Sequence, residues 1–241
     1  MIGYLLIADH GLIGDLHSVA LVGTNGTIDW YCCPNFDSPS VFGSILDARR
    51  GGCYCLAPTG RSWTSKQLYF PDTAVLITRF LTPDGVGEVE DFMPVAQGIG
   101  GGHRQRVVRR LLAVRGQVGF ELDCSPRFDY GRAEHAVERH EHGVLFRSPD
   151  CTLSLATETP LQIVDGAARA SFSLSQGESA TFVLEHVVGD DDPRGHSVAQ
   201  TRELADQTVA YWRRWLSQSR YTGRWREMVH RSGAHTGRAA R

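Results

Sequence analysis

The chain has 241 residues, of which 41% are hydrophobic and 22% charged, with a formal net charge of −2 at pH 7. This length accommodates one large β domain or two small domains with a substantial core. The composition is that of an ordinary globular protein, and the near-neutral charge gives no basis for nucleic acid or an anionic membrane surface as a partner.

The N-terminal sequence MIGYLLIADHGLIGDL carries no lysine or arginine ahead of its apolar residues, and Asp9 interrupts the apolar run early. It therefore differs from a secretory signal peptide. No apolar run in the chain approaches the ~20 residues that a membrane-spanning helix needs. We expect a soluble cytoplasmic protein without a membrane partner.

The stretch 23–46, GTNGTIDWYCCPNFDSPSVFGSIL, contains the densest local signals. Asn25-Gly26 favours a tight turn, because both residues tolerate positive φ. A β-prone run follows, interrupted by Asp29, and the loop PNFDSP at 34–39 then presents an aromatic ring beside a carboxylate. The sequence predicts a turn, a strand and a rigid loop in that order.

Four residues of this stretch are candidate site residues, and they allow two interpretations. In the first, Asp29 and Asp37 accept backbone N–H groups at a structural corner while the aromatic rings fill the core. In the second, Trp30 or Phe36 stacks on a ligand in a polar pocket that the two aspartates line. The residues alone leave both interpretations open.

The six cysteines give no sign of a metal site or of local disulfides. They are Cys32, Cys33, Cys53, Cys55, Cys124 and Cys151. Neighbouring side chains on a strand point to opposite faces, so adjacent and alternate pairs make poor bridges. The spacing also differs from the C-x₂-C spacing of zinc sites. We expect reduced, mostly buried thiols.

The middle of the chain predicts many short strands. Residues 74–82 and 86–93 form an expected hairpin around the turn TPDG, and 53–56 a short strand before it. Residues 106–114 and 117–124 form a second expected hairpin, with a turn at Arg115-Gly116. Further strands are expected at 144–147, 152–157, 170–174 and 181–188. Strands at this spacing indicate a mainly β fold, an antiparallel β-sandwich over residues 1–189.

The pattern changes after Gly189. Ser197 and Gln200 resemble a capping box at the start of a helix. One helical stripe then contains Leu204, Ala205, Thr208, Val209, Trp212, Trp215 and Leu216. This helix closes on the sandwich, packs against a missing neighbour, or does both. A second helix is expected within 221–232, so that 190–232 is a helical linker, and 233–241 lacks apolar periodicity and is expected to be disordered.

Two segments resemble a known family. The run IGDLHSVALVGTNGTIDWYCCPNFDSPSVFGSILD at 13–47 and the stretch YTGRWREMVHRS at 221–232 are similar to the N-terminal region of bacterial glycoside hydrolase family 15 proteins, the glucoamylase and trehalase group. The resemblance covers roughly 5–232 and then stops. It implies a β-super-sandwich domain that is normally followed by a helical (α/α) barrel, and thus a chain truncated before that barrel or split from it.

The resemblance also implies a function. It implies inverting hydrolysis of α-linked glucosides, in trehalose or α-glucan oligomers, with no cofactor. The family's catalytic glutamates lie in the barrel, so no residue here inherits a catalytic role. The barrel would dock on the helix with Trp212 and Trp215, leaving an exposed apolar patch on this chain, and a sugar would at most reach Asp29, Trp30, Phe36 and Asp37 at its rim.

Other potential chemistry has simpler explanations. Glu88, Glu90 and Asp91 on one strand are expected to form a solvated edge, and Asp91 cannot share a face with the two glutamates. The segment HAVERHEH, with His135, His140 and His142, is expected to be a solvated loop or hairpin, because it lacks a defined metal-ligand spacing. Two alternatives to the non-catalytic domain remain. One is a free-standing carbohydrate-binding module that uses Trp30, Phe36 and Trp63, and the other is a complete enzyme.

Overall fold

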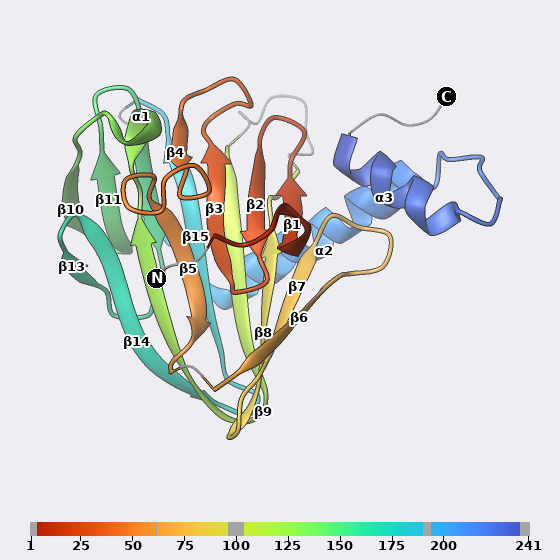
Figure 1. Ribbon diagram of the computed structural model, residues 1–241, viewed down its shortest axis with the longest axis horizontal. Coiled ribbons are helices and arrows are strands. Elements are labelled where there is room, and N and C mark those ends of the chain that lie inside the picture. Colours follow the sequence, from red (N-terminus) through yellow and green to blue (C-terminus); the bar gives the residue numbers. More distant parts are fainter. Residues whose placement is uncertain (1–3, 61, 96–103, 190–193, 237–241) are drawn as a thin grey trace.

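Strand β9 (Arg106–Ser125) runs through both layers of an antiparallel β-sandwich (Figure 1). The computed structural model describes residues 4–60, 62–95, 104–189 and 194–236. All pairings between the described strands are antiparallel. The mainly β sandwich with C-terminal helices that the sequence predicts is confirmed.

The first layer is formed by the second half of β9 together with β1 (His10–Gly14), β2 (Val19–Gly23), β3 (Thr27–Cys32), β4 (Ser40–Phe42), β5 (Cys53–Pro58), β13 (Gln162–Val164) and β14 (Ala167–Ser175). The second layer is formed by the first half of β9 together with β6 (Thr64–Tyr69), β7 (Leu76–Leu81), β8 (Gly85–Phe92), β10 (Ala136–His140), β11 (Gly143–Arg147), β12 (Thr152–Ala156) and β15 (Ser179–Val187). The helical elements are the 3₁₀ turn η1 (Ile7–Asp9), the short α1 (Phe128–Gly131), α2 (Val198–Leu216) and α3 (Arg226–Thr236).

The predicted hairpin at Arg115-Gly116 is wrong, because β9 continues through it. Gly116 has φ of 68°, and a Cβ there would collide with the carbonyl oxygen of Asp84. The positive φ bends the strand without reversing it. Residues before the bend pair with β15 and β8, and residues after it pair with β14 and β5. A glycine turn signal therefore marks the point where one strand changes layers.

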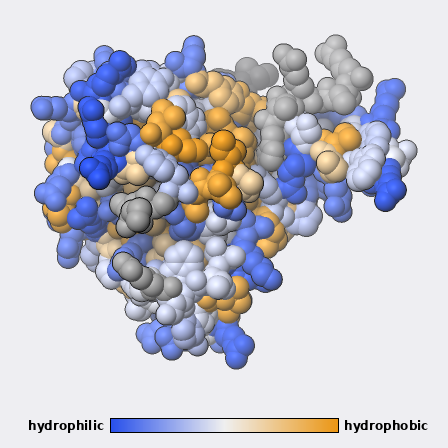
Figure 2. Space-filling view, in the orientation of Figure 1, coloured by the Kyte–Doolittle hydropathy of each residue, from blue (hydrophilic) through white to orange (hydrophobic). Residues whose placement is uncertain are grey.

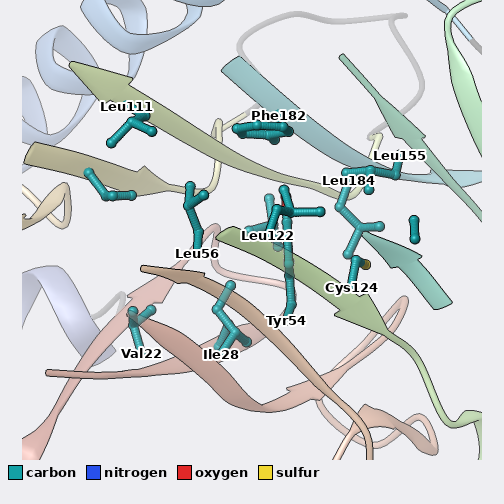
Figure 3. Close-up of a cluster of buried hydrophobic side chains, with 14 of the residues drawn as sticks. Val22, Ile28, Tyr54, Leu56, Leu111, Leu122, Cys124, Leu155, Phe182 and Leu184 are labelled. Carbon is teal, nitrogen blue, oxygen red and sulfur yellow. The ribbon is translucent and has the colours of Figure 1, made fainter. Parts of the chain in front are cut away.

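The core lies between the two layers, and its side chains alternate along each strand as the sequence predicts. From β9 it takes Val118, Phe120, Leu122 and Cys124, each at most 2% exposed, and from β15 Phe182 and Leu184. Figure 3 shows Val22, Ile28, Tyr54 and Leu56 among the residues of this same cluster. Fully burying one large apolar side chain contributes about 1.5–3 kcal/mol, so this interior dominates the stability of the sandwich.

Helix α2 begins with the predicted capping box. The Ser197 hydroxyl accepts a hydrogen bond from the Gln200 backbone N–H at 3.2 Å, and the Gln200 side chain accepts from the Ser197 N–H at 2.9 Å. The reciprocal bonds satisfy two donors that a helix N-terminus otherwise leaves unpaired. The start of this helix is thus encoded locally.

The apolar stripe of α2 faces the sandwich and is buried there except for Leu204, Val209 and Trp215, which are half-buried, so the expectation of an exposed docking patch around Trp212 is wrong. The side chain of Trp212 is 1% exposed and packs with Ala74 and Leu216. Ala205 packs in a neighbouring cluster on the outer face of the second layer, with Val75, Phe92, Val108 and Val183. The outer face of this layer is itself apolar, and α2 covers it.

Exposed apolar side chains in the C-terminal helical region lie instead on and around α3. Met228 is 65% exposed and Trp225, just ahead of the helix, is 56% exposed. Figure 1 shows α3 at one side of the sandwich, next to the C-terminal part of α2. Because α3 continues to Thr236, it includes the first residues of the predicted disordered tail, 233–241, while 237–241 lie outside the described residues. None of the described helices is long and apolar enough to cross a membrane.

Candidate functional site

Asp29 lies in β3 at an irregularity in the pairing between β3 and β2. Val22 pairs with Ile28 and Leu21 with Trp30, so Asp29 is the extra residue of a β-bulge. Its carbonyl accepts a hydrogen bond from the Ile45 N–H at 3.2 Å. The bulge turns the carboxylate towards the N-terminal segment, where it meets a histidine that the sequence alone did not indicate.

The partner of Asp29 is His10, at the start of β1. His10 Nε2 lies 2.7 Å from Asp29 Oδ2, and the two side chains are 2% and 12% exposed. His10 Nδ1 donates to the Leu6 carbonyl at 2.8 Å, which fixes the ring and leaves one proton for the contact between Nε2 and the carboxyl group. Burial raises the pKa of Asp29, and the hydrogen bond and charge of His10 oppose this rise. Among the described residues none donates to Asp29 Oδ1.

Phe36 and Asp37 lie in the loop after β3 and are exposed, with Phe36 57% exposed. The loop is held by backbone bonds, since the Phe36 N–H donates to the His17 carbonyl at 3.0 Å and the Ser38 N–H donates to Asn35 at 3.1 Å. Trp30 is half-buried in β3. Within the described chain no hydrogen bond or ion pair joins Asp29 to Asp37. The structure thus separates a buried dyad from an exposed loop.

Trp63, the third aromatic of the binding-module alternative, lies far from Phe36. The segment between β5 and β6 and the loop after β3 occupy opposite ends of the sandwich (Figure 1). The ring of Trp63 packs edge-on against Phe80, with centroids 5.2 Å apart, and its N–H donates to the Gly60 carbonyl at 3.3 Å. Phe36 and Trp63 therefore do not form one stacking platform.

The acidic strand forms ion pairs rather than a solvated edge, which corrects that expectation. Glu88 lies 2.5 Å from Arg79, and Glu90 lies 2.6 Å from Arg110. Strand β8 is interior, paired with β7 and β9. Asp91 points to the opposite side from the glutamates, as predicted, and is fully buried. An arginine engages each of the two glutamates, so neither is a free general acid or base.

Asp91 is paired with Arg109, and both side chains are 0% exposed. Arg109 Nε and Nη2 bond to the two Asp91 oxygens at 2.8 and 3.2 Å. Its remaining donors bond to the carbonyls of Tyr54 and Gly26 at 2.8 and 2.7 Å, and its guanidinium lies 4.8 Å from the centre of the Tyr54 ring. Nearby Asp91 raises the pKa of Arg109 against the opposing effect of burial. This network connects β8, β9, β5 and the turn before β3.

Glu185 forms a second charge cluster, between β15 and the segment that leads into α2. Its carboxylate lies 2.8 Å from Arg104, 2.8 Å from Arg106 and 3.3 Å from His196. Burial acts to raise its pKa, but the hydrogen bonds from His196 and Arg104 and the charge of Arg106 outweigh burial and lower the pKa to about 2.

We expect this cluster to make the protein acid-sensitive. A carboxyl group whose pKa is lowered on folding stabilises the fold above its unfolded pKa, near 4.5, and this stability is lost as pH falls towards 2. The full contribution is at most about 3 kcal/mol. Urea unfolding at pH 7 and pH 3 should show Glu185→Gln less stable than wild type at pH 7 and closer to it at pH 3.

Glu138→Gln is the matched control, because Glu138 and Arg147 form an exposed pair at 2.9 Å. Its effect should stay below about 1 kcal/mol at both pH values. A gap between wild type and Glu185→Gln that is the same at pH 7 and pH 3 would contradict the prediction.

Two further surfaces lie outside these charge networks. A groove of about 430 Å³ separates α3 from the β6–β7 turn and is lined by Tyr69, Asp72 and His230, among others, with His230 3.0 Å from Asp72. The second surface, here called the N-terminal apolar patch, consists of Tyr4, Leu6, Ile7 and Leu46, each at least 60% exposed. Figure 2 shows hydrophobic surface, in orange, gathered in the upper centre of the face that carries the N-terminal segment. The described residues contain no group of three side chains placed to hold a metal ion.

The family to which the chain is related is given by comparison with known protein families. The family described as trehalase-like, N-terminal, matches residues 5–212, from the N-terminal apolar patch into α2. The chain belongs to this family.

Individual relatives of this trehalase-like N-terminal chain are full-length trehalases. The trehalase of Thermoplasma volcanium is 30% identical over 236 residues, which cover 95% of this chain and 37% of the relative. That of Thermoplasma acidophilum is 31% identical over 218 residues, covering 88% and 36%. That of Mycobacterium tuberculosis is 28% identical over 249 residues, covering 94% and 36%. The chain spans little more than a third of the length of these relatives.

Proposed function

We propose that the chain is the non-catalytic N-terminal domain of a trehalase-type glycosidase of glycoside hydrolase family 15. The enzyme would act on α-linked glucosides, in trehalose or α-glucan oligomers. The observation that carries the proposal is the similarity to trehalases over only 36–37% of their length. A cytoplasmic location and the division into 1–189, 190–232 and 233–241 remain predictions within it.

Four carboxylates on β3 and β8 support a non-catalytic role. Glycosidic hydrolysis by the usual route needs two carboxyl groups on opposite sides of the scissile bond. Glu88, Glu90 and Asp91 are each bound by an arginine, and Asp29 is held by His10. These four side chains form interactions within the sandwich, and in our proposal the catalytic pair comes from a further domain.

In our proposal that domain contacts α3 and the N-terminal apolar patch rather than α2. The stripe of α2 is already buried or half-buried, whereas Trp225 and Met228 are more than half exposed. Exposed apolar surface of this kind is typical of interaction sites. Phe36 and Asp37 would lie at the rim of the sugar site, and Asp29 and Trp30 would support the strand from which that loop extends.

The first test is turnover by the 241-residue chain itself. We expect no release of glucose from trehalose or maltose, because the carboxylates of β3 and β8 are paired with His10 or with arginines and our proposal places the catalytic pair in a further domain. The control is a mock preparation from the same host. Glucose release by the chain that exceeds the mock would contradict the non-catalytic proposal.

The exposure of Phe36 favours a second candidate, a free-standing carbohydrate-binding module. Titration with trehalose or maltose, followed by tryptophan fluorescence, separates the two functions. If the chain is the non-catalytic domain, we expect no saturable change in fluorescence up to millimolar sugar, since Phe36 and Asp37 would form only the rim of the sugar site. A saturable change that Phe36→Ala abolishes and Trp63→Phe retains would support the binding module instead.

A further inference from the structure

Two cysteines that are distant in the sequence meet at one end of the sandwich. Cys33 follows β3 and is 3% exposed within the main core, and Cys151 precedes β12 and packs against that core while keeping partial access to solvent. Both side chains thus belong to the same packed region, and each thiol shifts the pKa of the other through a hydrogen bond. The side chain of His186, on the neighbouring β15, is hydrogen-bonded to Cys151. The six cysteines all carry free thiols.

The surroundings give the two thiols different chemistry. The hydrogen bond from Cys33 lowers the pKa of Cys151, burial and Asp150 oppose this, and the hydrogen bond and charge of His186 add to it, so that the pKa is about 6. The pKa of Cys33 is raised well above its usual value, because Cys33 is the donor to Cys151 and is buried. At neutral pH the pair is therefore a thiolate, partly accessible, beside a protonated thiol.

We propose that Cys33 and Cys151 form a disulfide when the protein meets a peroxide, and that Cys151 reacts first. The Cys151 sulfur attacks one oxygen of hydrogen peroxide, the O–O bond breaks, and a sulfenic acid and one water result. The Cys33 sulfur then attacks the sulfenic sulfur, the S–O bond breaks, and a second water leaves with the proton of Cys33. Two thiols and one peroxide thus give one disulfide and two waters, with the two electrons passing from sulfur to peroxide.

The other four cysteines are poor competitors for this reaction. Burial raises the pKa of Cys53 to about 12, and it also raises the pKa of Cys32, Cys55 and Cys124. A thiol with a raised pKa carries little thiolate at neutral pH and reacts slowly with peroxide. The contact between Cys33 and Cys151 also holds the second sulfur next to the first.

The disulfide would join a loop and a turn that lie in different layers of the sandwich. Cys33 opens the loop that presents Phe36 and Asp37, and Cys151 ends the turn between β11 and β12, in which the Ser148 N–H donates to the Cys151 carbonyl at 3.0 Å. A disulfide would tie this loop of the first layer to a turn of the second. The inference depends on the thiol pair and stands whether or not the chain belongs to a glycosidase.

The test uses the full chain, reduced, freed of reductant and treated with hydrogen peroxide. After alkylation, a tryptic digest without reductant is analysed by mass spectrometry. We expect a cross-link between the peptides 1–49 and 148–169, which contain Cys33 and Cys151. The oxidised chain should also melt about 5–10 °C higher, because the bridge closes a long loop. Absence of this cross-link, or oxidation that falls mainly on Cys53, Cys55 or Cys124, would overturn the proposal.

Single-residue variants identify which cysteines form the disulfide. Cys32 shares the tryptic peptide of Cys33, so Cys32→Ser is the matched control and should still cross-link, whereas Cys33→Ser should not. His186→Gln should raise the pH midpoint of the alkylation of Cys151 by iodoacetamide, because the hydrogen bond and charge that favour the thiolate are lost. A cross-link that survives in Cys33→Ser, or an unchanged pH midpoint in His186→Gln, would contradict the assignment.

Discussion

Replacing Arg109 by methionine is expected to lower the free energy of unfolding by about 3–5 kcal/mol. The substitution leaves the Asp91 carboxylate buried without its partner and removes the donors that bond to the carbonyls of Tyr54 and Gly26. An uncompensated buried charge costs more than the pair itself contributes. Urea unfolding at pH 7, followed by circular dichroism, measures the loss.

The neighbouring residue provides the matched control. Arg110 pairs with Glu90 at 2.6 Å, but the two side chains are 25% and 37% exposed. Arg110→Met should therefore cost less than about 1 kcal/mol. Combining Arg109→Met with Asp91→Leu should recover part of the loss, since no buried charge remains, although the two carbonyls stay unpaired. Equal losses in Arg109→Met and Arg110→Met would show that the buried network is not a main support of the sandwich.

Trp212→Ala is expected to lower the free energy of unfolding by about 3–5 kcal/mol, because it removes the indole ring that packs α2 against the sandwich. The indole is 1% exposed, packs with Ala74 and Leu216, and meets the Tyr211 ring edge-on at a centroid distance of 5.4 Å. Removing it leaves a cavity that the layered strands beneath can only partly fill. Thermal and urea unfolding of the purified variant measure the effect.

Trp225→Ala is the control for that substitution. Trp225 is 56% exposed, so its removal should change the stability of this chain by no more than about 0.5 kcal/mol. Trp212→Phe keeps most of the buried ring and removes an indole N–H that has no partner among the described residues, and it should cost less than about 1.5 kcal/mol. If Trp225→Ala destabilised the chain as much as Trp212→Ala, the assignment of α2 as the buried helix would be wrong.

These two predictions bear on the proposed function. Arg109 and Asp91, which are both fully buried, connect strands to each other, and the helix expected to receive a partner packs on the sandwich instead. The surface around α3, the N-terminal apolar patch and the loop with Phe36 and Asp37 are exposed and thus available to a partner. A role as a supporting domain is consistent with that distribution.

Local features were predictable from the sequence because each depends on a few neighbouring residues. Ser197 and Gln200 are close enough to form a capping box in any helix that begins there. The alternation of Val118, Phe120, Leu122 and Cys124 specifies a strand with one buried face whatever lies opposite. The turn TPDG likewise specifies its hairpin. These patterns were sufficient to predict a sandwich followed by helices.

Long-range partners were decided only by the tertiary structure. The sequence shows an arginine at 109, an aspartate at 91 and cysteines at 33 and 151, but strand order and register bring them together. Gly116 illustrates the limit, since its positive φ suits both a hairpin and a bend, and only pairing with β14 and β15 selects the bend. Register is set by the packing free energy of the whole sandwich, which no local pattern contains. The sequence therefore determined which segments are strands and helices, and the tertiary structure decided which charges, thiols and apolar faces meet.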